Sequence, residues 1–340
     1  MFNVQIDYSN RKPQLFIISL LLLGLLVACG APAAEAPSAP NSLQTVRLGV
    51  GYIPDVQFAP LYVAQQKGFY AEEGLEVEIE YGFENDFVAL AAQGKREFAV
   101  ASGDQVILAR SQGLPITYIM KWYERYPVAL MSVAEQGINQ PTDLTGKTVG
   151  LPGLYGASFI GWKALVYAAG LDESAITVEE IGFTQAAAVQ QKQVDAAVVY
   201  IANEPNQLRS QGLDINVIQV SDYINLVSNG LVTGETLLTD NPELVQRMTR
   251  ATLRGITYTI DHPDEAFAIA REIIPEITDE TAPTQRQVLD SSIELFESDA
   301  PGLSRQEDWQ ASVEFMQQTG LLEQTVEVEQ LFTNRFVEQK

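Results

Sequence analysis

The chain is poor in three kinds of side chain. Its 340 residues include one cysteine and one histidine, and 21 Lys and Arg stand against 44 Asp and Glu. One cysteine excludes an internal disulfide and one histidine leaves no ordinary zinc site, so we expect neither metal nor cofactor. The formal net charge of −23 argues against nucleic acid as a partner, because phosphate backbones are also anionic.

Long apolar runs are also missing beyond Cys29. The run at 15–28, which follows Arg11 and Lys12, is shorter than the roughly 20 residues that span a bilayer. Its length and basic flank predict a secretory signal peptide over residues 1–28. The sequence Leu-Val-Ala-Cys at 26–29 resembles the bacterial lipobox, whose cysteine is acylated. We therefore expect a lipid anchor at Cys29 on the extracytoplasmic face of the cell membrane; the alternative is a small apolar residue inside an ordinary signal.

A tether and a two-part body follow. Residues 31–42 are almost entirely Ala, Pro, Ser, Glu and Asn, which cannot build a core, so 29–44 is predicted to be a flexible tether. The folded body begins near Thr45. Its roughly 295 residues exceed a typical single core and suffice for two lobes.

Two similar series of alternating strands and helices predict an α/β fold with mostly parallel sheets. The first series has strands at 46–52, 75–81 and 98–101, with helices at 56–67 and 86–93 between them. The second has strands at 147–151, 176–181 and 196–200, with helices at 157–168 and 185–191.

Two extended stretches, 116–133 and 217–232, are expected to carry the chain between the lobes. Helices are then predicted at 243–259, 263–273, 284–296, 305–319 and 326–336. We assign 45–122 plus 225–340 to lobe I and 123–224 to lobe II. Two chain crossings of this kind form a hinge that allows closure around a ligand.

One segment carries a family resemblance. Residues 51–64 (GYIPDVQFAPLYVA), continued by 67–75 (KGFYAEEGL), resemble periplasmic binding proteins of the NMT1/THI5-like family. These proteins serve ABC importers of thiamine pyrimidine precursors, riboflavin, sulfonates and nitrate. The later segments 98–104, 143–150 and 194–199 match in order, so the resemblance spans nearly everything after the tether.

The resemblance implies a two-lobe, type II-like periplasmic-binding-protein fold, a monomer, and delivery of a small molecule to a membrane permease. Fungal members of the family make the thiamine pyrimidine with histidine and a cysteine-rich segment. This chain offers neither, so no catalytic residue is carried over. A binding protein is therefore the first hypothesis, and an enzyme of the same fold and a sensory module are the others.

The ligand is expected beyond the carboxyl ends of the strands. The loops there contain no Lys or Arg. Their aromatic, amide, hydroxyl and carboxylate side chains are those of Tyr52, Asp55, Gln57, Phe58, Tyr81, Phe83, Asn85, Asp86, Ser102, Asp104, Gln105, Tyr155, Ser158, Tyr200, Asn203 and Glu204. Because an oxyanion is normally met by Arg or Lys, this set favours a flat, uncharged heterocycle.

Riboflavin is the preferred ligand, because the hinge segment 122–126 adds three rings that could sandwich a tricyclic system. The formylaminopyrimidine used to salvage thiamine remains the alternative, since its amino group needs one carboxylate. The predicted ligand-binding residues are Tyr52, Asp55, Gln57, Phe58, Asn85, Asp86, Ser102, Trp122, Tyr123, Tyr155, Ser158, Tyr200 and Glu204.

Several of these residues also have a structural interpretation. Asp55 can cap the helix that follows it, and Glu204 before Pro205 can do the same. Aromatic residues at strand ends can pack the lobes rather than stack on a ligand. Trp162 and Trp309 fall inside predicted helices and are expected in the core.

Overall fold

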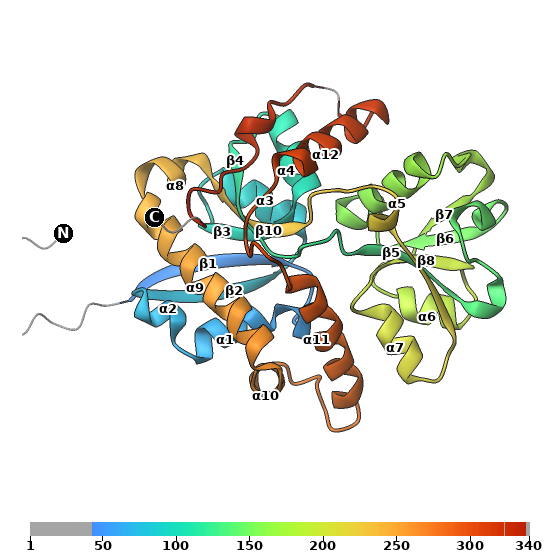
Figure 1. The fold of residues 1–340 in the computed structure, drawn as a ribbon, viewed down its shortest axis with the longest axis horizontal. Coiled ribbons are helices and arrows are strands. Elements are labelled where there is room, and N and C mark those ends of the chain that lie inside the picture. The colour runs from blue at the N-terminus through green and yellow to red at the C-terminus, as the bar shows by residue number, and fades with distance from the viewer. Residues whose placement is uncertain (1–42, 323, 338–340) are drawn as a thin grey trace, which may run out of the picture. The chain divides into compact units, whose positions relative to one another are not determined.

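The computed structural model describes residues 43–322 and 324–337. The predicted signal peptide, the lipidation site Cys29 and nearly all of the predicted tether lie outside these residues. Within them, no helix combines the length and the apolar character that crossing a membrane requires. The described part is an α/β structure with two separate five-stranded sheets (Figure 1).

The first sheet has the strand order β2-β1-β3-β10-β4. Its strands are β1 (Gln44–Gly51), β2 (Leu75–Gly82), β3 (Phe98–Ser102), β4 (Ile116–Lys121) and β10 (Asn229–Gly234). β1 pairs in parallel with β2 and β3, whereas β10 is antiparallel to β3 and β4. Four strands therefore run in one direction, and β10, the last of the five in the sequence, runs in the opposite direction.

The second sheet repeats this plan in the order β7-β6-β8-β5-β9. Its strands are β5 (Val128–Val133), β6 (Thr148–Leu151), β7 (Thr177–Glu180), β8 (Ala196–Tyr200) and β9 (Ile215–Gln219). β6 is parallel to β7 and β8, and β5 is antiparallel to β8 and β9. Again one strand, at the fourth place, is reversed.

Helices cover both sheets (Figure 1). Those of the first are α1 (Ala59–Gln66), α2 (Phe69–Glu72), α3 (Glu84–Ala92), α4 (Gly103–Ser111), α8 (Glu235–Asp240), α9 (Pro242–Asp261), α10 (Pro263–Ile273), α11 (Ala282–Phe296) and α12 (Gln306–Gln318). Those of the second are α5 (Gly156–Ala168), α6 (Gln185–Gln190) and α7 (Glu204–Ser210). The longest, α9, starts where sequence rules place it, because Pro242 occupies its first turn and Asn241 Oδ1 accepts from Leu244 N–H at 3.1 Å.

Two crossings, 122–127 and 220–228, connect the sheets. They are joined to each other, since Trp122 N–H donates to Asn229 O at 2.9 Å and Ser228 Oγ donates to Tyr123 O. We propose that the lobe boundaries at 122/123 and 224/225 lie in these crossings and that they act as the hinge.

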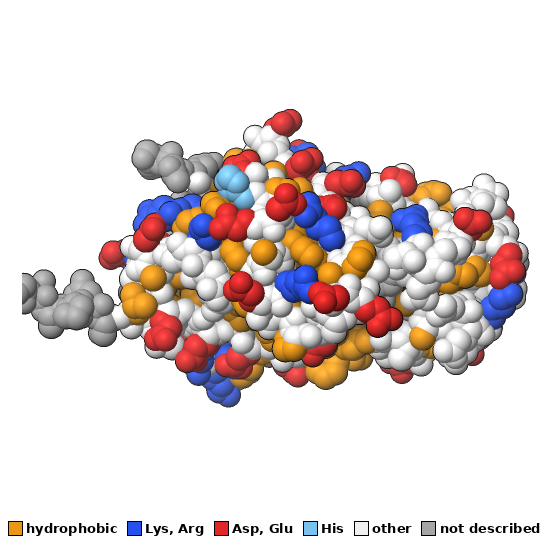
Figure 2. Space-filling view, turned by 90° about the horizontal axis from the view of Figure 1, so that it is seen from below, with side chains coloured by type: hydrophobic (Ala, Val, Ile, Leu, Met, Phe, Trp, Pro, Cys, Tyr) orange, Lys and Arg blue, Asp and Glu red, His pale blue; other side chains and the backbone are white. Residues whose placement is uncertain are grey.

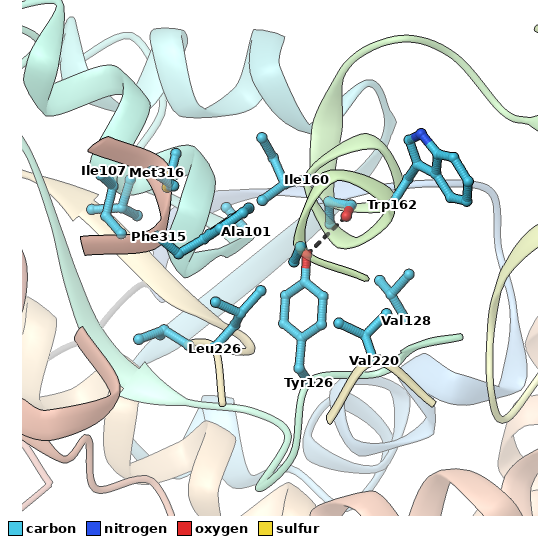
Figure 3. Packing of buried hydrophobic residues seen from close by; sticks show 14 of the residues in the cluster. Ala101, Ile107, Tyr126, Val128, Ile160, Trp162, Val220, Leu226, Phe315 and Met316 are labelled. Atoms are coloured by element: carbon cyan, nitrogen blue, oxygen red, sulfur yellow. Dashed lines mark hydrogen bonds between the residues drawn. The ribbon is translucent and has the colours of Figure 1, made fainter. Parts of the chain in front are cut away.

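A continuous apolar cluster surrounds the crossings (Figure 3). Tyr126, 2% exposed, lies beside Val128, Val220 and Leu226, and its hydroxyl donates to Ala157 O of α5 at 2.8 Å. The cluster includes residues of both sheets, so the crossings are packed rather than free. Trp162 and Trp309, at 1% and 0% exposure, are core residues as predicted.

One predicted helix is wrong. Residues 326–336 contain only the 3-10 turn η6 (Val328–Gln330). The segment instead lies along the edge of the first sheet: Tyr118 N–H donates to Leu331 O, and Thr333 N–H donates to Tyr118 O, both at 2.9 Å. The unpaired edge of β4 supplies these backbone partners, which outweigh a weak local helix preference. The helices α2, α4 and α8 were not predicted.

Candidate functional site

A cavity of about 110 Å³ lies between the two sheets. Both sheets contribute to its wall, together with the first crossing. The lining residues are Gly51, Tyr52, Gln57, Phe58, Gly82, Phe83, Glu84, Asn85, Val100, Trp122, Tyr123, Pro152, Gly153, Tyr155, Ala157, Ser158, Phe183, Gln185, Tyr200, Asn203, Glu204 and Asn229.

Most of the predicted site residues line this cavity. They are Tyr52, Gln57, Phe58, Asn85, Trp122, Tyr123, Tyr155, Ser158, Tyr200 and Glu204. Asp55, Asp86 and Ser102 do not. The strand-end rule therefore brings residues from distant parts of the chain to one place, as expected for an open α/β sheet.

The three predicted residues outside the lining have other surroundings. Asp55 is 7% exposed and caps the 3-10 helix η1 (Val56–Phe58) by accepting from Gln57 N–H at 3.0 Å. Burial raises the pKa of Asp55 to about 6. Asp86 is exposed on α3. Ser102 is fully buried, and its Oγ donates to Glu84 Oε1 at 2.7 Å, so it supports a wall residue.

Tyr52 connects the two halves across the cavity. Its ring meets Phe183 edge to face with centroids 5.2 Å apart, and its hydroxyl accepts from Asn203 Nδ2 at 3.4 Å. Its backbone has φ +132°, a conformation that non-glycine residues rarely adopt. Such strain persists only where surrounding structure holds it, and it is often found at binding sites.

The hinge aromatics form a fixed inner wall. Trp122 and Tyr123 are 2% and 3% exposed. Tyr123 stacks on Phe296 of α11 with centroids 5.4 Å apart and planes at 5°, and Trp122 meets the same ring edge to face. The Tyr123 hydroxyl donates to Gln57 Oε1 at 3.2 Å. One face of Tyr123 is therefore already occupied, so a ligand can use only the other.

Half-exposed rings form the mouth. Phe83 and Tyr155 are each 51% exposed and lie on opposite halves with centroids 6.2 Å apart. A Cβ atom at position 153 would lie 2.6 Å from the Tyr155 ring. Glycine at this position therefore leaves the ring the space it occupies. These rings could cover a flat ligand once it is bound.

Four polar or aromatic lining residues were not named as candidates: Glu84, Phe183, Gln185 and Asn229. Phe183 and Gln185 follow β7, a strand that was predicted but whose loop was not included among the candidate loops. The strand-end rule, applied there, would have found both. Asn229 opens the reversed strand β10, to which a rule about carboxyl ends does not apply.

Two glutamates dominate the electrostatics. Burial raises the pKa of Glu84 to about 7, with a further contribution from Asp104, and burial likewise raises that of Glu204 to about 7, with Asp55 adding to it. Asp104, just beneath, has its pKa raised to about 6 by burial. Among the described residues that line the cavity, none is Lys or Arg. The site therefore offers hydrogen-bond acceptors and aromatic faces but no cation to hold an oxyanion.

Comparisons with known sequences place the chain among binding proteins and their relatives. Residues 55–266 match the family model described as NMT1/THI5 like. The chain is 42% identical to the riboflavin-binding protein RibY of Chloroflexus aurantiacus, over 96% of this chain and 98% of the relative. It is 30% identical to the formylaminopyrimidine-binding protein of Halalkalibacterium halodurans, over 94% and 98%.

Solved structures confirm the predicted periplasmic-binding-protein fold. The alkanesulfonate-binding protein SsuA from Xanthomonas axonopodis pv. citri, bound to MOPS, has a TM-score of 0.68 at 14% identity, covering 85% of this chain and 98% of that one. The nitrate-binding protein NrtA from Synechocystis has a TM-score of 0.67 at 14% identity, covering 86% and 87%. Fold and sequence together show that the chain belongs to the NMT1/THI5-like family.

Proposed function

We propose that this protein captures riboflavin outside the cell and delivers it to the permease of an ABC importer. The observation that carries the proposal is the cavity wall, which combines aromatic rings with amides and carboxylates and, among the described residues, includes no basic side chain. A neutral tricyclic ring fits such a wall, and a sulfonate or nitrate does not. The 42% identity to a riboflavin-binding protein supports the same ligand.

The polar lining can also serve a ribityl chain. Gln57, Asn85 and Asn203 offer amide groups at the cavity wall, and Ser158 offers a hydroxyl. Ribityl hydroxyls both donate and accept, so amide partners suit them. The single histidine, His262, lies between α9 and α10 and does not line the cavity, which favours capture without chemistry.

Membrane attachment is part of the proposal. Cys29 follows an apolar run and is preceded by Leu26-Val27-Ala28, as an acylated cysteine would be. In cells fed a radiolabelled or alkynyl fatty acid, the wild-type protein should carry the label and Cys29→Ala should not. Label on Cys29→Ala would contradict the anchor.

The ligand is tested by titrating the purified body, residues 43–340, with riboflavin and following flavin fluorescence. We expect quenching with a dissociation constant of about 1 µM or lower, and no change in the flavin recovered afterwards. Formylaminopyrimidine, thiamine and taurine serve as competitors. Displacement of riboflavin by formylaminopyrimidine at lower concentration would assign the site to the pyrimidine instead.

A further inference from the structure

Two glutamates face the cavity from opposite halves of the molecule. Glu84 opens α3 beside the first sheet, and Glu204 opens α7 beside the second. Both line the cavity. Among the described residues, these two are the acidic side chains that line the cavity. Their oxygen atoms therefore decide which polar groups of a ligand the site accepts.

The protein holds Glu84 in a defined position. Its Oε1 accepts from both Ser102 N–H and Ser102 Oγ, the latter at 2.7 Å. Within residues 43–322 and 324–337, we find no hydrogen bond to Oε2. Gly51 permits this approach, because a Cβ there would meet Glu84 Cβ at 2.7 Å. One oxygen is thus fixed and the other is left for a ligand.

Glu204 is held in a similar way from the other side. Its Oε2 accepts from Tyr200 N–H at 3.1 Å, and the residue is 6% exposed. The acidic groups nearest these two glutamates are Asp104 and Asp55, and the phenols of Tyr126, Tyr200 and Tyr52 lie around them. No basic side chain in the described lining offsets their charge.

We propose that Glu84 and Glu204 are specificity-determining residues, which accept hydrogen bonds from N–H or O–H groups of the ligand and exclude its phosphorylated form. The inference rests on the proposed function. Riboflavin offers an imide N–H and ribityl hydroxyls, and a carboxylate accepts such bonds strongly in a water-poor site. Flavin mononucleotide carries a phosphate that would meet like charge without compensation. Burial raises the pKa of both glutamates, and Asp104 adds to the effect at Glu84 and Asp55 at Glu204.

The test titrates wild type, Glu84→Gln, Glu204→Gln and Asp240→Asn with riboflavin and with flavin mononucleotide at pH 8, above the pKa of both glutamates. Asp240 is the control, because it is an exposed carboxylate on α8 that does not line the cavity. Thermal melts of each variant check folding. Wild type should prefer riboflavin by about 100-fold or more.

Each glutamine variant should bind riboflavin about tenfold more weakly and show a riboflavin-to-mononucleotide ratio about tenfold smaller, while Asp240→Asn stays at wild type. Folded glutamine variants that keep both the wild-type affinity and the wild-type ratio would overturn the proposal. If the wild type bound no flavin, the proposed function would fail on its own. The same variants titrated with formylaminopyrimidine, whose amino group is the donor, then decide the role of the glutamates.

Discussion

Glu84 combines a binding position with a cost to stability. In an unfolded chain its carboxyl group ionises near pKa 4.5, whereas burial and Asp104 raise the folded pKa to about 7. Between these two values the folded state holds a proton that the unfolded state has lost. The contribution of this group to stability therefore falls as pH rises from about 4.5 to 7 and stays low above that.

Glu84→Gln should remove this pH-dependent loss. We expect the variant to match wild type near pH 4.5 and to exceed it above pH 7, by at most about 3 kcal/mol in the free energy of unfolding. Urea unfolding of both proteins from pH 4.5 to 8 measures the difference. Asp86→Asn is the control and should show no such trend. A Glu84→Gln stability curve parallel to wild type across this range would contradict the argument.

Gly153 determines where the Tyr155 ring lies, although it has no side chain of its own to contact a ligand. In Gly153→Ala the new Cβ would lie 2.6 Å from Tyr155 Cε1, so the half-exposed ring must turn away. Because that ring can move into solvent, we expect little change in melting temperature but roughly threefold to tenfold weaker riboflavin binding. Fluorescence titration and a thermal melt separate the two effects. An unchanged affinity would mean that Tyr155 does not stack on the ligand.

Individual residues also show how much of the candidate site could be predicted from the sequence. Asp55 has the capping role that was named as its alternative, because a short acidic side chain before a helix is a recognisable local signal. Glu84 was not named as a candidate, and the helix that was expected to start at Asp86 in fact starts at Glu84. A shift of two residues turns a different side chain toward the cavity.

At the scale of elements, one reversed strand in each sheet explains which features of the sheets could be predicted from the sequence and which could not. The parallel strands follow from alternating strands and helices and were predicted. β5 and β10 are each the first strand after a crossing and run against their neighbours. Their amino ends therefore meet the carboxyl ends of the others, as the pairing of Asn229 with Ser102 shows. Nothing local in the sequence marks this reversal, since it depends on which sheet the chain enters.

The position of β10 depends on Gly230. A Cβ there would lie 2.0 Å from the Tyr118 ring, which is fully buried and packs edge to face on Trp309 at 5.2 Å. Because neither ring has space to move, Gly230→Ala should destabilise the protein by about 1–3 kcal/mol. Urea unfolding measures the loss.

A double-mutant cycle with Tyr118→Leu identifies the cause. Where the ring has been removed, adding Gly230→Ala should cost clearly less than it does in wild type. Equal costs in the two backgrounds would show that Tyr118 is not the obstacle.

At the scale of the whole molecule, acidic residues outnumber basic ones by 44 to 21. Figure 2 shows acidic side chains spread over one face with basic ones among them. Across the structure several exposed charges form pairs, including Arg254 with Glu72 and Lys192 with Glu135, both at 2.7 Å. Exposed pairs of this kind add little stability. The net charge of −23 instead favours solubility and disfavours anionic ligands and partners.

Contacts between the two halves hold them together, at the cavity and beside it. Phe83 meets Tyr155, Tyr52 meets Phe183, and Asn206 Nδ2 of α7 donates to Ser291 Oγ of α11 at 2.8 Å. We propose that these contacts form when the halves close about the crossings. Closure would then lower the radius of gyration when riboflavin is added, which X-ray scattering in solution can measure.

Phe83→Ala tests the closing contact directly. The substitution removes the ring that faces Tyr155 at 6.2 Å, and because Phe83 is half-exposed the fold should tolerate it. A closed state that loses an aromatic pair worth about 1 kcal/mol opens more often, so riboflavin should dissociate about two- to tenfold faster while its association rate stays near wild type. Stopped-flow fluorescence measures both rates.

Leu154→Ala, a half-exposed neighbour of Tyr155 that does not line the cavity, is the control and should keep the wild-type rates. A Phe83→Ala protein that releases riboflavin no faster than this control would show that the contact across the mouth does not hold the closed state.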